Sequence, residues 1–100
     1  MYEAGIEAFL AIIEARSLKK AGEMLSLTQA TISYRLKILE QEMGAQLIER
    51  NKGIQQITLT AFGENFVPIA NRWYLLKEYM TKLKSNGYQH FLSIGGSNSL

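Results

Sequence analysis

The stretch that most constrains the fold is residues 28–44, TQATISYRLKILEQEMG, because helix-ending signals frame a single apolar face. Thr28 can cap the start, since its hydroxyl can accept a hydrogen bond from a free amide in the first turn. Gly44 supplies the left-handed residue that ends many helices. Apolar side chains recur between them at helical spacing, at Ile32, Leu36, Leu39 and Met43. These signals predict an amphipathic helix.

The opposite face of this helix carries small, hydrogen-bonding or cationic side chains, namely Gln29, Ala30, Ser33, Tyr34 and Lys37. Such side chains suit an approach to base edges and phosphates. Glu40 would repel phosphates on that face, so we expect it to have a structural role.

Two shorter helices are predicted upstream. Apolar residues at helical spacing, from Ile6 to Ile13, predict a core-facing helix over residues 3–15. Ser17 is a candidate cap for a second helix that runs to about residue 26. A short helix and a tight turn, followed by a helix with small polar residues in its first turn, are typical of a helix-turn-helix. Generic helix pairs share this pattern, so spacing alone leaves an ordinary helical bundle open.

After Gly44 the pattern changes to two short stretches with strand character, residues 47–50 and 55–59. Asn51-Lys52-Gly53 lies between them and favours a turn. The pattern predicts a two-stranded wing over residues 47–59, with Arg50 and Lys52 where a cation could reach a phosphate or a minor groove. The alternative is a hairpin whose charges contact only water.

Thr60 is placed to cap a long helix that runs to about residue 84. The apolar residues of this helix alternate in steps of four and three, as in a heptad seam: Phe62, Phe66, Ile69, Trp73, Leu76, Met80 and Leu83. The upstream module is too small to cover a helix of about 35 Å. We therefore expect the start of the helix to dock on its own domain. A second copy would pair through Phe66, Ile69, Trp73, Leu76, Met80 and Leu83. Pro68 should bend this helix.

Composition excludes several classes of protein. The chain has no cysteine, so it can form neither a disulfide nor a thiolate metal site. Its one histidine, His90, has no carboxylate or cysteine companion, and the chain offers no nucleophile–base pair, so neither an enzyme nor a metal site is expected. The net charge of +2 favours nucleic acid only weakly, so a case for DNA depends on local arrangement.

The sequence also bears on the cellular location and on the character of the last residues of the chain. No apolar run approaches the roughly 20 residues of a membrane helix, and early glutamates argue against a secretory signal. We expect a cytoplasmic protein without membrane contact, at the nucleoid when bound to DNA. Residues 91–94 look like a strand without a partner, and Gly95-Gly96-Ser97 follow. The two interpretations are a frayed tail and the start of a further, truncated domain over residues 87–100, and we favour the second.

In order and spacing, these pieces resemble the N-terminal part of a LysR-type transcriptional regulator, from residue 3 to about residue 97. The matching pieces are the first helix ending in Glu14, Ser17, the run Leu25-x-Leu-Thr-Gln-Ala-Thr-Ile-Ser33, Leu39-Glu40, Gly44-x-x-Leu47, Arg50, Leu59-Thr60-x-x-Gly63 and the long helix. The resemblance implies a mainly α fold with a small β wing. It implies a winged helix-turn-helix domain over residues 1–59, a linker (dimerisation) helix over residues 60–86 and the start of an effector-binding domain over residues 87–100.

The resemblance also implies a function. A dimer with antiparallel linker helices would bind a dyad-symmetric operator in double-stranded DNA, with recognition helix 28–43 in the major groove and wing 47–59 on the backbone or minor groove. The implied DNA-binding residues are Lys19, Thr28, Gln29, Ala30, Thr31, Ser33, Tyr34, Lys37, Arg50, Asn51, Lys52 and Gly53. No cofactor is expected in these residues. A full-length protein is expected to bind a small co-inducer and to form a tetramer, with RNA polymerase as a further candidate partner.

The chain departs from the family pattern at Gly22, Ala30, Tyr34 and Ile48, and two of these positions lie on the predicted DNA surface. Ala30 stands where proline is common, and Tyr34 stands where arginine is frequent, so base preference should differ from that of relatives. The alternative function is a winged-helix module that binds another protein, with the long helix as its docking surface. Indifference to DNA at every salt concentration would favour that alternative.

Overall fold

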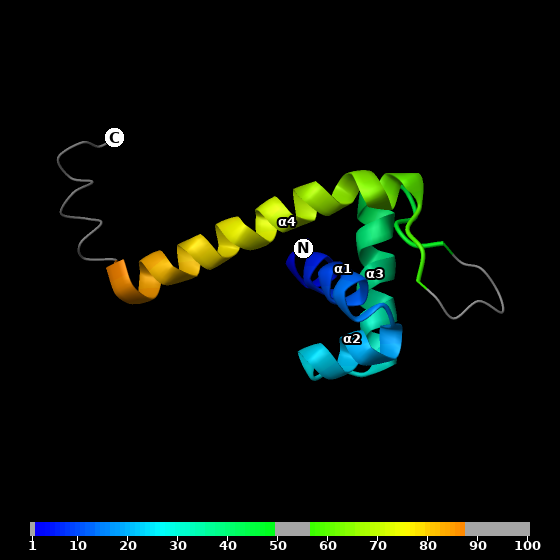
Figure 1. Ribbon diagram of the computed structural model, residues 1–100, viewed down its shortest axis with the longest axis horizontal. Coiled ribbons are helices and arrows are strands. Elements are labelled where there is room, and N and C mark those ends of the chain that lie inside the picture. The colour runs from blue at the N-terminus through cyan, green and yellow to red at the C-terminus, as the bar shows by residue number, and fades with distance from the viewer. Residues whose placement is uncertain (1, 50–56, 88–100) are drawn as a thin grey trace.

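The protein is described by a computed structural model over residues 2–49 and 57–87. Within these ranges four α-helices follow one another: α1 (Glu3–Ala15), α2 (Leu18–Leu25), α3 (Gln29–Met43) and α4 (Ala61–Lys82). A π-helical turn, η1 (Leu83–Gly87), continues α4. The first three helices form a compact module, and α4 runs along it and then extends away as a long arm (Figure 1). No helix in the described part of the chain is long and apolar enough to cross a membrane.

The predicted helix starts are confirmed, because a hydroxyl caps each of α2, α3 and α4. The Oγ of Ser17 accepts a hydrogen bond from the amide of Lys20 at 3.1 Å. Thr28 accepts in the same way from Thr31 at 3.1 Å, and Thr60 accepts from Gly63 at 2.9 Å. Such caps satisfy amides that a helix leaves unbonded in its first turn. Gly44 ends α3 in the left-handed conformation, with φ of 78°.

The core of the module lies around α1. Phe9 and Ile12 of α1 are fully buried together with Ile32 and Leu39 of α3 and Leu47 after it. Helices α2 and α3 meet closely at Gly22, where an added Cβ would lie 2.6 Å from the carbonyl oxygen of Leu27. Glycine lowers the helix propensity of α2, but here it lets α2 approach the turn that leads into α3. Burial of this face leaves the other face of α3 exposed.

The base of the predicted wing is present as an antiparallel bridge between Ile48 and Leu59. The amide of Glu49 donates to the carbonyl of Thr58 at 2.8 Å, and the amide of Thr60 donates to that of Leu47 at 3.0 Å. The predicted turn and its flanking residues, including Arg50, Asn51, Lys52 and Gly53, lie outside the described residues. The antiparallel pairing is therefore confirmed only where the two segments meet the module.

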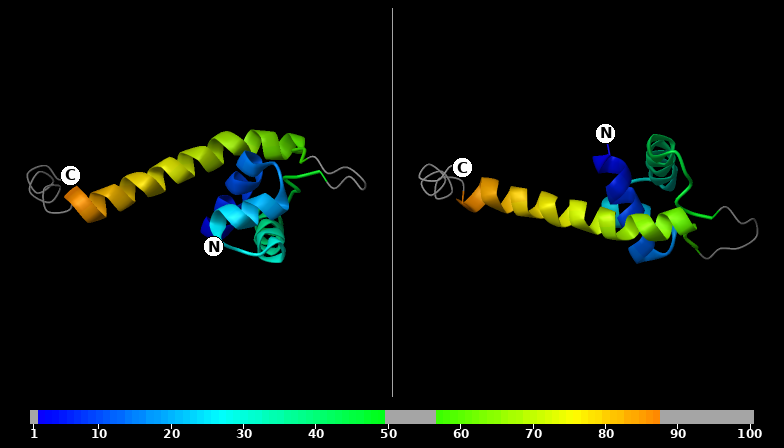
Figure 2. Two further views of the ribbon diagram at one scale, coloured as in Figure 1. Left: turned by 60° about the horizontal axis from the view of Figure 1, so that its bottom comes forward. Right: turned by 90° about the horizontal axis from the view of Figure 1, so that it is seen from above.

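Helix α4 corrects one part of the predicted dimer seam. Phe66 is only 4% exposed, and its ring packs edge-on against Phe9 with centroids 5.6 Å apart. It belongs to the core of its own chain because α1 crosses α4 there (Figure 2), so it is not available to a second copy. Ile69, Leu76 and Met80 are more than half exposed. Trp73 and Leu83 are partly exposed, and Trp73 packs against the core. The helix continues unbroken through Pro68.

Candidate nucleic-acid interface

The outward face of α3 carries most of the residues predicted to contact bases. Gln29, Ala30, Ser33, Tyr34 and Lys37 are all exposed, and Tyr34 is the most prominent, with 64% of its surface accessible. The apolar face of the same helix is buried through Ile32, Leu36 and Leu39, so the core fixes which side α3 presents. Helical period places the exposed residues together along one stripe. The structure thus brings this predicted set together.

Two of the predicted DNA-binding residues are hydrogen-bonded to each other at the start of α3. The hydroxyl oxygens of Thr28 and Thr31 lie 2.9 Å apart and are hydrogen-bonded to each other. The Thr28 oxygen also accepts from the Thr31 amide, so its capping role is established in the structure. Thr31 is partly buried. Their contacts with DNA stay a prediction, and any such contact would share an oxygen already used for the cap.

Gln41 also belongs to this exposed face, although it was not among the residues predicted to contact DNA. It is exposed on α3, one turn after Lys37 and two turns after Tyr34. Residues at i, i+3 and i+7 lie on one face of a helix, so Gln41 extends the stripe of Tyr34 and Lys37. The spacing from Tyr34 could have identified it. An amide at this position can both donate and accept hydrogen bonds, as contacts with base edges or phosphates require.

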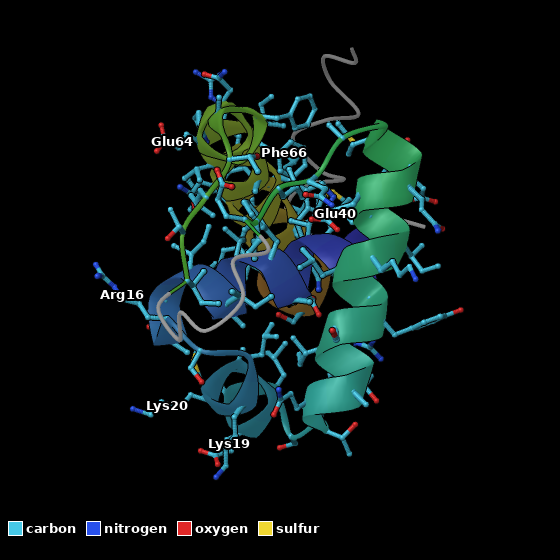
Figure 3. All side chains as sticks on the ribbon, turned by 90° about the vertical axis from the view of Figure 1, so that its right-hand side faces the viewer. Arg16, Lys19, Lys20, Glu40, Glu64 and Phe66 are labelled. Carbon is cyan, nitrogen blue, oxygen red and sulfur yellow. The ribbon has the colours of Figure 1, made fainter. Side chains whose placement is uncertain are left out.

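A second group of polar side chains lies where α1 ends and α2 begins. Arg16, Lys19 and Lys20 are exposed and project outward from this corner of the molecule (Figure 3). We call these three residues the basic edge. None of them forms an ion pair with another residue of the described chain. Only Lys19 was predicted; the density of cations between residues 16 and 20, with no acid among them, could have identified the other two.

Glu40 connects the recognition helix to the base of the wing. Its side chain points from α3 toward the other helices (Figure 3), and only 7% of the residue is exposed. The carboxylate oxygen Oε2 accepts from the amide of Leu47 at 2.8 Å and from that of Ile48 at 3.4 Å. The expected structural role is confirmed. Glu40 therefore fixes where the wing leaves the end of α3.

Replacing Glu40 by alanine should lower the free energy of unfolding by about 1–3 kcal/mol, because the buried amide of Leu47 would lose its acceptor. Glu42, an exposed glutamate of the same helix, provides the matched control. Its replacement by alanine should change stability by no more than about 0.5 kcal/mol. Urea unfolding of both variants measures the difference, and equal losses would contradict the role of Glu40.

The described residues carry no site for metal chemistry. No group of three or more histidine, cysteine, aspartate or glutamate side chains could hold a metal ion in the part of the chain that the structure describes. What this surface offers is an exposed polar helix face, a neighbouring group of cations and the base of a wing. These are the parts from which a winged helix-turn-helix DNA-binding domain is built, here with a long linker helix.

Comparisons with known proteins give the family. The family model described as "Bacterial regulatory helix-turn-helix protein, lysR family" matches residues 4–64, and the chain belongs to this family. The HTH-type transcriptional regulator HdfR of Yersinia pestis is 37% identical over 100 residues, which cover 95% of this chain and 32% of HdfR. The chain therefore spans about a third of the length of the curated relatives it matches.

Solved structures agree with the fold. The DNA complex of the CbnR DNA-binding domain superposes with a TM-score of 0.71 and 28% identity, covering 81% of this chain and 90% of that one. The complex of the BenM DNA-binding domain with catB site 1 DNA gives a TM-score of 0.75 and 27% identity, covering 84% of this chain and 90% of that one. The predicted winged helix-turn-helix fold with a linker helix is confirmed.

Proposed function

We propose that this LysR-family domain binds double-stranded DNA as a homodimer and reads a dyad-symmetric operator. The start of α3 enters the major groove of each half-site, and the wing contacts the backbone or the minor groove. The observation that carries the proposal is the exposed stripe from Gln29 to Gln41, held outward by a fully packed opposite face. The similar CbnR and BenM domains were solved with DNA, which supports the same use of α3 here.

Dimerisation is proposed to occur through the exposed apolar face of α4. Ile69, Leu76 and Met80 follow heptad spacing and are 57%, 59% and 57% exposed. Phe66 is excluded from this interface because its own chain buries it. Apolar surface of this kind is stabilised when another helix covers it. Antiparallel pairing of two α4 helices would carry a recognition helix to each half-site.

Selection from a random duplex library tests the proposal directly. Sequencing of the retained DNA should give a dyad-symmetric motif with half-sites about one helical turn apart. The variant Tyr34→Ala should alter the preferred bases within each half-site, whereas Glu78→Ala, an exposed change on α4, should not. A single half-site would exclude the dimer. No enrichment at low salt would favour the protein-binding module.

The basic edge should contribute to affinity without contributing to sequence preference. Replacing Lys19 by glutamine should make the slope of log affinity against log salt concentration less negative, by about 0.9 for each phosphate that the protein no longer neutralises. The slope changes because fewer counterions are released when the variant binds DNA. The motif preferred by the protein should stay the same. Lys82→Gln, an exposed change on α4, is the control and should leave the slope unchanged. An unchanged slope for Lys19→Gln would remove Lys19 from the interface.

The remaining parts of the proposal concern a longer protein. The relatives are about three times the length of this chain, and an effector-binding domain that begins near residue 87 would take a small co-inducer. We propose tetramer formation and contact with RNA polymerase for such a protein, and a cytoplasmic location at the nucleoid. These 100 residues alone should bind DNA without responding to a co-inducer, which binding assays with and without candidate effectors would measure. No catalytic role is proposed.

A further inference from the structure

Helix α4 contacts α1 through an apolar site and a polar site. The first is apolar, where Phe66 and Ala70 are buried and Phe66 packs on Phe9 of α1. The second is polar and lies toward the N-terminal end of α1. There the ammonium group of Lys77 lies 2.9 Å from a carboxylate oxygen of Glu3 and also forms a hydrogen-bonded ion pair with Glu7. Beyond this point α4 extends past the module (Figure 1).

The polar site also involves the surface of Trp73. The Lys77 ammonium lies 5.5 Å from the centroid of the Trp73 ring, within the range of a cation–π contact. We call Lys77, Glu3 and Glu7 the linker clamp. Hydrogen bonds from the Lys77 ammonium to the carboxylates of Glu7 and then Glu3 raise the pKa of Lys77 above its ordinary value, and the same bond to Glu3 lowers the pKa of Glu3. Lys77 and Glu3 are therefore both charged at neutral pH.

The segment of α1 that carries the clamp also contacts the recognition helix. Gly5 lies between Glu3 and Glu7, and a Cβ added there would lie 2.7 Å from the Cβ of Leu39 in α3. The same Cβ would lie 3.2 Å from the carbonyl oxygen of Arg35. One end of α1 therefore holds α4 through its carboxylates and α3 through its backbone. The angle between the linker helix and the recognition helix depends on this end of α1.

We propose that the linker clamp sets the angle of α4 against the winged-helix module, and through that angle the half-site spacing that the dimer prefers. This inference rests on the proposed function, because it requires two modules joined through α4. Lys77 is a positioning residue here and does not contact DNA. The clamp would act on the distance between recognition helices rather than on the bases that each one reads.

A small rotation is sufficient for this effect because α4 is long. From Phe66 to Leu83 the helix extends about 25 Å at 1.5 Å per residue. A rotation of about 10° around Phe66 would move its far end by about 4 Å at this rise per residue, which exceeds the spacing of about 3.4 Å between successive base pairs. In a symmetric dimer the two rotations add, so loss of the clamp would misplace one recognition helix relative to the other.

The first test measures this geometry without DNA. The chain has no cysteine, so Glu23→Cys introduces a single labelling site on the exposed side of α2. Electron–electron resonance then gives the distance between the two labels of a dimer. Lys77→Met, which keeps an aliphatic side chain near Trp73 and removes the charge, should shift or broaden the distance distribution. Lys77→Arg, which keeps the charge, should restore it, and Lys82→Met is the control on the same helix.

The second test measures the functional consequence. Operators with identical half-sites and a spacer varied by one base pair at a time should bind the wild type with a clear optimum. Lys77→Met should move that optimum or weaken the discrimination against neighbouring spacers by roughly two- to fivefold, the range that a surface ion pair supports. The Glu3→Gln/Glu7→Gln double variant should do the same. Affinity for a single half-site should stay unchanged in all of them.

The outcomes separate the inference from the function on which it rests. Unchanged label distances and an unchanged spacer profile in Lys77→Met would overturn the clamp. A wild type that binds no operator would overturn the proposed function, while a shift in label distances would still support the clamp as the determinant of the α4 angle. If Lys77→Met lost as much affinity for a single half-site as for the full operator, that result would also count against the inference, because it would indicate a general structural role.

Discussion

Replacing Leu76 and Met80 by glutamate should convert the proposed dimer into a folded monomer. Both side chains are more than half exposed on α4 and lie on the heptad face left free by the module, so a partner helix would bury them. Two carboxylates buried in an apolar interface would prevent that pairing. The affinity for a full dyad operator should fall by about 10²- to 10⁴-fold, because each half-site would bind independently.

Light scattering measures the mass of the variant, and circular dichroism tests whether its helices are retained. Leu75→Glu is the matched control, because Leu75 is 67% exposed on the same helix but points about 100° away from Leu76 around the helix axis. It should leave both the dimer and the operator affinity close to those of the wild type. A stable dimer containing both Leu76→Glu and Met80→Glu would show that another surface pairs the two copies.

The helices themselves could be predicted because their signals are local. A hydroxyl at position 17, 28 or 60 caps the amide three residues later, and this bond depends on no distant part of the chain. The exposed stripe of α3 follows from the same periodicity that buries Ile32, Leu36 and Leu39. The predicted bounds of these helices, and the polar face offered to DNA, agree with the structure for that reason.

Contacts between distant residues could not be predicted from such signals. Glu40 could be given a structural role, but its bonds to the amides of Leu47 and Ile48 depend on how the chain turns after α3. The linker clamp joins Lys77 to residues more than sixty positions earlier, and no periodicity connects them. The density of cations between residues 16 and 20 could have drawn attention to Arg16 and Lys20, but only the fold shows that their side chains project outward where α1 ends and α2 begins.

The heptad pattern of α4 shows this limit most clearly. Phe66 and Ile69 occupy equivalent seam positions in the sequence, yet Phe66 is 4% exposed and Ile69 is 57% exposed. Spacing describes which side of a helix is apolar, but it does not distinguish a neighbour in the same chain from one in a second copy. Only the crossing of α1 over α4 assigns Phe66 to its own core (Figure 2).

Replacing Phe66 by alanine should therefore lower the free energy of unfolding of a single chain by about 3–5 kcal/mol, because it removes a ring packed against Phe9 and leaves a cavity. Ile69→Ala should cost the same chain no more than about 0.5 kcal/mol, since its side chain is largely exposed. Urea unfolding of both variants in the monomeric Leu76→Glu/Met80→Glu background removes the contribution of dimerisation, which would otherwise add to the stability of each.

The same pair should show the opposite order in a dimerisation assay. Ile69→Ala in an otherwise unchanged chain should raise the dimer dissociation constant by about tenfold or more, because each copy would bury less apolar surface against its partner. Equal losses of monomer stability for Phe66→Ala and Ile69→Ala would mean that α4 does not dock on α1 as the packing of Phe66 on Phe9 indicates. The two measurements together divide one continuous heptad seam into the residues that fold the chain and those that join two copies of it.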